Sequence, residues 1–122
     1  METYTSRERE KLLHEELSRI VSLLIEKYQP EKIILFGSLA EGRIHEWSDI
    51  DLLIIKDTFK RPIERILEVS KLVRPRVGVD FFVYTPSEFA LCLEEEVSFF
   101  RDILTQGKVL YEKGNSGVDE DR

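Results

Sequence analysis

The sequence has little cysteine and no long apolar run, and each shortage excludes a class of protein. Its 122 residues include one cysteine, Cys92, so an internal disulfide and a thiolate metal cluster are both excluded. No apolar run approaches the roughly 18 to 20 residues that cross a bilayer, and the charged N-terminus lacks the apolar core of a signal peptide. We therefore expect a cytoplasmic protein that makes no membrane contact.

Basic residues are also in the minority. Eighteen lysines and arginines stand against 24 aspartates and glutamates, which gives a formal net charge of −6. Proteins that bind nucleic acids broadly carry a basic footprint for the phosphates, so we expect no direct nucleic-acid binding. A phosphate ligand would have to be held locally or through bound cations.

The length and composition indicate one globular domain. A chain of 122 residues with 42% hydrophobic side chains can bury one core but not two. We predict a domain over residues 1–112. The segment that follows, residues 113–122, has no apolar spacing and is predicted to be a disordered tail.

Hydrophobic spacing and turn signals predict the order of the helices and strands. A capping box at residues 5–8 begins a helix that Pro30 ends, and Pro62 and Pro86 stand at two further helix starts. These signals predict an α/β (α+β) fold with a small mixed sheet of three to four strands flanked by helices. The predicted elements are a helix to about residue 28, strands at 32–36, 50–55 and 77–85, helices at 62–74 and 86–105 with a possible break near Ser98, and an edge strand at 108–112.

Two aspartates open the strand at residues 50–55, which is apolar on both faces and therefore central in the sheet. Asp49 and Asp51 are two residues apart, so their side chains emerge on the same face. Carboxylates this close repel and raise each other's pKa, and a hard divalent cation with oxygen ligands relieves both effects. The pair indicates a Mg²⁺ site; the alternative is a solvated strand start.

Asp80 is the only acid in the strand at 77–85, where apolar residues surround it. If this strand lies beside the one at 50–55, Asp80 can complete a cluster of three carboxylates. Two Mg²⁺ ions on such a cluster support phosphoryl or nucleotidyl displacement. The alternative for Asp80 is a structural ion pair with Arg74 or Arg76.

Gly37 and Ser38 end the strand at 32–36 and fit the other half of that chemistry. Glycine lets the backbone turn sharply close to a ligand, and Ser38 can offer its hydroxyl and backbone N–H groups to phosphate oxygens. A phosphate cradle beside a metal cluster implies a nucleoside triphosphate as the substrate.

These residues together carry a resemblance to a known family. Gly37-Ser38, ten residues, and Asp49-Ile50-Asp51 resemble the GS-x10-DxD signature of the DNA polymerase β-like nucleotidyltransferases, with Asp80 in the place of the third carboxylate. The small size and the closing "GKVLYE" make the chain similar to the minimal nucleotidyltransferases, over roughly residues 10–112.

The resemblance implies a role for each residue of the motif. Asp49 and Asp51 would bind two Mg²⁺ ions, and Asp80 would bind the catalytic ion and help deprotonate the acceptor hydroxyl. Gly37 and Ser38 would hold the β and γ phosphates of ATP or another nucleoside triphosphate, and Ser48 would orient the Asp49 loop. The implied product is an acceptor that carries a nucleotidyl group, with AMP as the expected group.

One segment departs from the family pattern. Many relatives carry arginine between the serine and the next glycine, whereas this chain has Leu39, Ala40 and Glu41. Arg43, just past Gly42, is the nearest substitute for neutralising the triphosphate.

The resemblance also implies a partner and leaves three functions open. In similar proteins the partner is a HEPN toxin, and the nucleotidyltransferase acts as antitoxin by adenylylating a toxin tyrosine. The alternatives are a non-catalytic antitoxin or scaffold that neutralises its partner by complexation, and a small-molecule nucleotidyltransferase. A homo-oligomer is also possible.

Four other side chains are given no catalytic role. Arg9 and His14 match a spacing found in HEPN ribonucleases, but five residues apart on a helix they point to different sides, so the match is attributed to chance. His45 and Trp47 lie in the loop of the motif, where loop packing is favoured over contact with a base or a partner.

Overall fold

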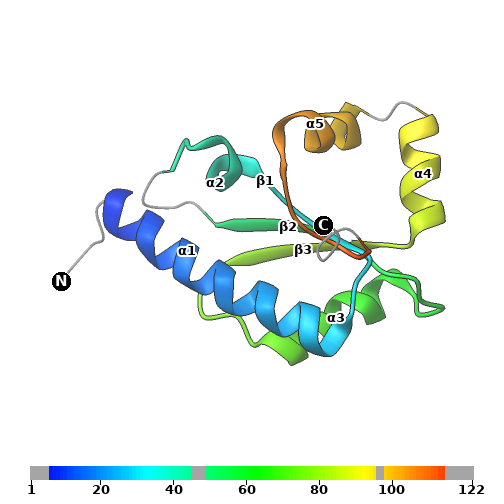
Figure 1. Ribbon diagram of the computed structural model, residues 1–122, viewed down its shortest axis with the longest axis horizontal. Coiled ribbons are helices and arrows are strands. Elements are labelled where there is room, and N and C mark those ends of the chain that lie inside the picture. Colours follow the sequence, from blue (N-terminus) through cyan, green and yellow to red (C-terminus); the bar gives the residue numbers. More distant parts are fainter. Residues whose placement is uncertain (1–5, 45–48, 96–97, 115–122) are drawn as a thin grey trace.

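A computed structural model of the chain describes residues 6–44, 49–95 and 98–114. Helices and strands alternate along it, much as the sequence predicts (Figure 1). The elements are α1 (Ser6–Leu23), a π-helical turn η1 (Leu24–Tyr28), β1 (Lys32–Phe36), α2 (Gly37–Glu41), β2 (Ile50–Ile55), α3 (Pro62–Val73), β3 (Val79–Tyr84), α4 (Pro86–Glu94), α5 (Ser98–Gln106) and β4 (Lys108–Glu112).

The four strands form one mixed sheet in the order β3-β2-β1-β4. β1 pairs antiparallel with both β2 and β4, whereas β2 and β3 run parallel. A parallel pair needs a crossover connection, and α3 supplies it between β2 and β3. The predicted fold class is therefore confirmed, and β2 is an interior strand of the sheet.

Helices cover both faces of the sheet and create two apolar cores (Figure 1). On one face, α1 and α3 bury side chains such as Leu17 and Val69 against Ile33 and Leu52. On the other face, α5 places Phe100 and Ile103 against alternate residues of the same strands. Because β2 contributes to both cores, its continuous apolar run follows from burial on two sides.

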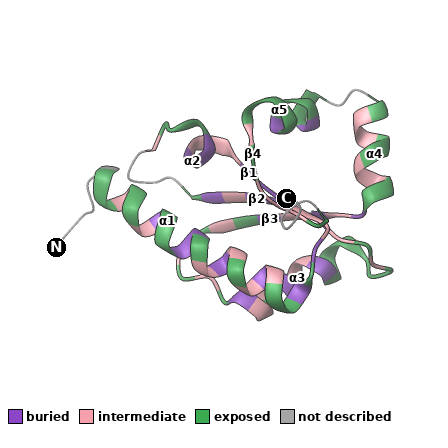
Figure 2. Cartoon of the chain, in the orientation of Figure 1, coloured by how far each residue is buried: buried purple, intermediate pink, exposed green. Residues whose placement is uncertain are grey.

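The face that carries α4 and α5 is covered more thinly than the face that carries α1 and α3. None of the described residues of α4 is buried, and Cys92 on this helix is only half-buried (Figure 2). Phe99 of α5 remains 40% exposed next to the buried Phe100. Among the described residues, the core on this face is therefore the smaller of the two.

The described elements test the predicted boundaries at β3 and in the helical segment after it. The third strand begins at Val79 rather than residue 77, because the chain still bends at residues 76 and 77 after α3. The segment predicted as helical over residues 86–105 is two helices, α4 and α5, and α5 begins at Ser98, where the possible break was predicted; residues 96–97 are outside the described part. The capping box at residues 5–8 lies partly outside it as well.

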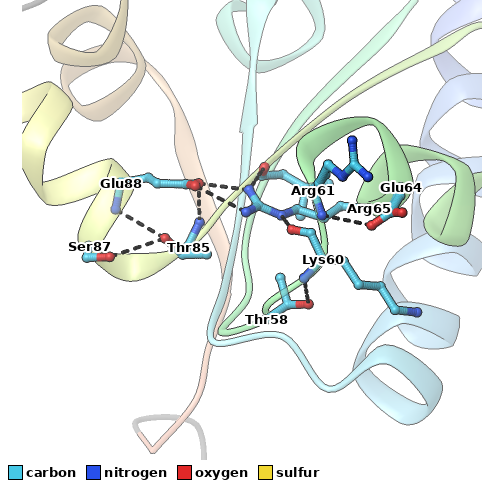
Figure 3. Close-up of polar contacts among 9 residues, drawn as sticks. Thr58, Lys60, Arg61, Glu64, Arg65, Thr85, Ser87 and Glu88 are labelled. Carbon is cyan, nitrogen blue, oxygen red and sulfur yellow. Dashed lines mark hydrogen bonds and ion pairs between the residues drawn. The ribbon is translucent and has the colours of Figure 1, made fainter.

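An ion pair between the buried Arg65 and the partly exposed Glu88 ties α3 to the start of α4 at the end of β3. The Arg65 guanidinium donates to both carboxylate oxygens of Glu88, at 2.7 and 3.1 Å, and to the Val83 carbonyl (Figure 3). Glu88 also accepts the backbone N–H of Thr85 in the capping box of α4. This network lies at the last residues of β3 and the start of α4, whereas Asp80 is near the first residue of β3.

β4 runs along β1 in the opposite direction. Lys108 lies opposite Leu35 and Glu112 lies opposite Lys32, so β4 begins near the end of β1 that leads into Gly37. Residues 115–122, most of the predicted tail, are outside the described part. Among the described helices, none combines the length and the apolar character that a membrane span requires.

Candidate active site

The three predicted carboxylates lie at one corner of the sheet. Asp51 is the second residue of β2 and lies opposite Asp80, the second residue of β3, in the parallel register. On its other side Asp51 lies opposite Phe36, the last residue of β1. Asp49 precedes β2 directly, where the Ile50 N–H donates to the Gly78 carbonyl at 3.1 Å. The parallel pairing of β2 and β3 is what brings Asp80 to this corner.

Asp51 is the electrostatic centre of this group. Burial, the charge of Asp80, a hydrogen bond between the two carboxyl groups and the charge of Asp49 together raise the pKa of Asp51 to about 6. Asp49 and Asp80 are exposed, whereas Asp51 is partly buried. Asp80 is thus next to another acid, and no contact among the described residues pairs it with Arg74 or Arg76, the structural alternative.

Two glycines leave the space that these carboxylates occupy. A Cβ on Gly37 would overlap the Asp51 carboxylate, and a Cβ on Gly78 would lie 2.5 Å from Asp49 Oδ1. Gly37 also has a φ of +78°, a left-handed conformation that other residues rarely adopt. Position 37 therefore requires glycine twice, for its backbone conformation and for the carboxylate beside it.

Arg9 of α1 is a cation at this corner that the sequence did not assign to the site. Its Nη2 lies 3.5 Å from Asp49 Oδ1, and its side chain is only 16% exposed although Asp49 is 51% exposed. The first turns of α1 reach the same end of the sheet as α2 and the starts of β2 and β3 (Figure 1). His14 instead lies 3.8 Å from Glu10, so Arg9 and His14 have different partners.

A buried glutamate on α1 anchors the loop that leads to Asp80. Glu16 is 5% exposed and accepts two hydrogen bonds from Arg19, at 2.8 and 2.7 Å, and one from the Arg76 backbone N–H at 2.6 Å. Arg19 also donates to the Arg74 carbonyl. The bonds from Arg19 are the main reason that the pKa of Glu16 is lowered. Helix α1 therefore holds the loop before β3 in place.

The predicted phosphate-binding residues occupy the first turn of α2. Gly37 and Ser38 are its first two residues, directly after β1. Arg43 follows the helix and donates to Glu41 at 3.0 and 2.6 Å, with 68% of its side chain exposed. Its partner is thus Glu41, not one of the three aspartates. Ser48, His45 and Trp47 are outside the described residues.

The chemistry of the three carboxylates fits Mg²⁺, which prefers oxygen ligands. Burial, and after it the charges of Asp80 and Asp49, raise the pKa of Asp51, and a bound divalent cation would favour its ionised form. Within the described residues, no three His, Cys, Asp or Glu side chains already converge as a ready metal site. The aspartates share the corner, but they would have to reorient to hold an ion together.

A small cavity opens beside Gly37, on the thinly covered face of the sheet. Its volume is about 150 Å³, and it lies between the end of β1, α2 and α5. Aromatic and acidic side chains both line it: Phe36, Phe99, Glu41 and Asp102. Asp49, Asp51 and Asp80 do not line it, so the cavity adjoins the corner only through Gly37.

Comparison with known families agrees with this geometry. The family model described as "Polymerase beta, Nucleotidyltransferase" matches residues 18–116, which include Gly37, Ser38 and all three aspartates. The chain belongs to this family. The match spans the whole sheet, so the family fold and the observed fold coincide.

Similar proteins are found in archaea. Two proteins of Methanocaldococcus jannaschii, each named a putative protein adenylyltransferase, are 34% and 32% identical to the chain. The first match covers 78% of this chain and 94% of the relative. The second match covers 87% of this chain and 76% of the relative. A crystal structure described as a putative nucleotidyltransferase from Sulfolobus solfataricus shares the fold, with a TM-score of 0.65, 20% identity and 93% of each chain covered.

Two residues of the corner were missed in the sequence. Arg9 is 40 positions from Asp49, and no local pattern in a helix indicates which distant carboxylate its arginine will meet. Gly78 did leave a signal, since a glycine in a strand pattern often marks a close approach of another group. Because Gly78 is two residues before Asp80, this signal could have assigned it to the carboxylate site.

Proposed function

We propose that this chain is a Mg²⁺-dependent nucleotidyltransferase that transfers AMP from ATP to a hydroxyl acceptor. The observation that supports this most directly is the corner formed by Asp49, Asp51 and Asp80 beside the first turn of α2. The acceptor we propose is a tyrosine of a HEPN-type partner toxin, so the chain would act as an antitoxin. Family membership and the names of the two archaeal relatives support protein adenylylation.

Each residue of the corner has a place in the proposed reaction. Asp49 and Asp51 would hold Mg²⁺, and Asp80 would hold the catalytic ion; bound Mg²⁺ neutralises phosphate charge and polarises the reacting phosphate. Gly37 and Ser38 present the first backbone N–H groups of α2 to the β and γ phosphates. Ser48 would orient the loop that carries Asp49.

The proposed chemical step is a displacement at the α-phosphorus. Asp80 is exposed and can help to take the proton of the acceptor hydroxyl. The acceptor oxygen then forms a bond to the α-phosphorus, and the bond from that phosphorus to the bridging oxygen breaks. Pyrophosphate leaves with the electron pair of that bond, and the acceptor keeps AMP.

The chemical test uses ATP labelled at the α-phosphate. The purified protein is incubated with Mg²⁺, labelled ATP and the protein encoded beside it. We expect label on that protein, lost in Asp49→Ala and Asp80→Ala and retained in Asp57→Ala, a control in the exposed loop after β2. Absence of transfer with intact binding of Mg²⁺ and ATP would reject the proposed enzyme.

A non-catalytic antitoxin is the second candidate, and one observation favours it. In the segment after Ser38, Leu39 and Ala40 are buried and apolar, and Arg43 pairs with Glu41. This candidate predicts that Asp49→Ala and Asp80→Ala neutralise a toxin as well as the wild-type chain does. Growth of cells that express the toxin with each variant separates the two functions.

A further inference from the structure

The corner contains one arginine whose position the family motif does not explain. Arg9 belongs to the first helix, and its guanidinium approaches Asp49 Oδ1 at 3.5 Å. Its side chain is largely buried, at 16% exposure, although α1 offers solvent on its outer face. Removing most of a guanidinium from water costs free energy unless carboxylates or similar groups compensate it.

The charges around Arg9 show what it compensates. Asp51 lies opposite Asp80 in the parallel register of β2 and β3, and Asp49 directly precedes β2, so three carboxylates share one corner of the sheet. Within the described part of the chain, the cation in contact with this group is Arg9. In the metal-free protein, Arg9 therefore supplies part of the positive charge that a bound cation would otherwise bring to the carboxylates.

The first turn of α2 has the opposite requirement. A bound triphosphate carries several negative charges, yet the residues after Ser38 are two buried apolar side chains and Glu41. Arg43 is held by Glu41 through two hydrogen bonds and directs its charge at that acid. A guanidinium matches phosphate geometry well, so a nearby arginine would fill this deficit.

We propose that Arg9 exchanges partners: it holds Asp49 in the metal-free protein and binds the triphosphate when Asp49 turns to a divalent cation. Arg9 thereby takes the place of the arginines that many relatives carry after the serine of the motif. This inference rests on the proposed function, because it uses the same metal and nucleotide.

The exchange predicts effects of opposite sign in one variant. Arg9→Gln removes a cation that competes for Asp49, so the affinity for metal alone should rise by about two- to fivefold, the value of an ion pair with a solvent-exposed carboxylate. The same variant loses a charged phosphate ligand, so the affinity for the nucleotide in saturating metal should fall about tenfold. A purely structural arginine would shift neither affinity, or would lower both.

The experiment measures both affinities on the full chain. Mn²⁺ binding without nucleotide is followed by electron paramagnetic resonance, and binding of α,β-methylene-ATP at saturating Mn²⁺ is followed by calorimetry. Arg7→Gln, an exposed neighbour on α1, is the matched control, and Arg9→Lys should recover part of the nucleotide affinity. Thermal unfolding checks that each variant is folded.

The outcomes separate this inference from the proposed function. Tighter Mn²⁺ binding together with weaker nucleotide binding in Arg9→Gln, and no change in Arg7→Gln, supports the exchange. Unchanged or weaker Mn²⁺ binding, or unchanged nucleotide binding, overturns it. If the wild-type chain binds neither Mn²⁺ nor the nucleotide, the proposed function itself fails, whatever the variants do.

Discussion

Asp51 lies directly opposite Asp80 across the parallel pair of β2 and β3, and their carboxyl groups share a hydrogen bond. Two acids in this arrangement destabilise a fold when both are ionised, because their repulsion acts in a partly buried place. The protein retains them at the rim of a sheet that is otherwise apolar on both faces. Such a cost is typical of a functional site, where local stability is exchanged for reactivity.

This relationship predicts that Asp51→Asn stabilises the metal-free protein at pH 7. The folded pKa of Asp51 is about 6, above the ordinary value of 3.8, so its ionised form costs stability above pH 6. After allowance for solvent near the site, we expect a gain of about 1–2 kcal/mol in the free energy of unfolding. Urea denaturation measures it, and Asp57→Asn, in the exposed loop after β2, is the control.

The same change should lose its benefit in acid. Below the ordinary pKa of 3.8, Asp51 is protonated in both the folded and the unfolded chain, so the difference between variant and wild type should vanish there. A gain that stays the same in this acid range and at neutral pH would show that the pKa of Asp51 is not its origin.

Metal binding should depend on the same ionisation. A carboxylate must lose its proton to bind a divalent cation, and Asp51 keeps its proton up to about pH 6. The affinity for Mn²⁺ should therefore be level above pH 7 and fall steadily as the pH drops below 6. Titrations between pH 5 and pH 8 test this; a constant affinity across that range would exclude Asp51 as a ligand.

Glycine variants separate backbone strain from crowding at the carboxylates. Gly37 and Gly42 both have positive φ, at +78° and +75°, but only Gly37 has a carboxylate where a Cβ would lie. Gly42→Ala should cost about 1 kcal/mol of stability through its backbone alone and leave Mn²⁺ binding intact. Gly37→Ala should cost more, because it also displaces Asp51, and should weaken Mn²⁺ binding. Equal effects of the two variants in urea and in Mn²⁺ titrations would contradict this explanation.

Glu16 predicts a second, opposite response to pH. Its pKa is lowered, mainly by the hydrogen bonds from Arg19, so it stabilises the fold above the ordinary value of 4.5, and this contribution is lost as the pH falls through the lowered pKa. At pH 7 we expect Glu16→Gln to lower the free energy of unfolding by about 1–3 kcal/mol. Chemical denaturation at pH 7 and pH 3 measures the change, and the exposed Glu15→Gln should have little effect at either pH.

The parts of the molecule that were predictable from sequence have local signals. Prolines at the starts of α3 and α4, the capping box at Thr85 and the alternation of β3 all act within a few residues of the chain. The β2 run is apolar on both faces because both are covered, which indicated an interior strand correctly. Gly37 and Asp51 likewise lie where the apolar runs predict them, just after one strand and at the start of the next.

The parts that were not predictable depend on distant contacts. Whether Asp80 reaches Asp51 is decided by the pairing of β3 with β2, which no short pattern specifies. Arg9 meets Asp49 only because α1 lies along the sheet, and Glu16 fixes the loop at Arg76 for the same reason. The sequence also did not indicate the partner of Arg43. In the structure this arginine pairs with Glu41, which competes with a phosphate for its charge.

The direction of β4 has a practical consequence for building fusions of this protein. β4 begins near Gly37 and ends at Glu112, opposite Lys32. A linker attached after this strand therefore starts at the end of β1 and β4 that lies away from the aspartates. The start of α1 lies at the other end, close to the aspartates, because Arg9 in its first turns contacts Asp49. Immobilisation or fluorescent labelling through the C-terminal side should therefore leave the carboxylates open to a partner, whereas a bulky group before α1 would crowd them.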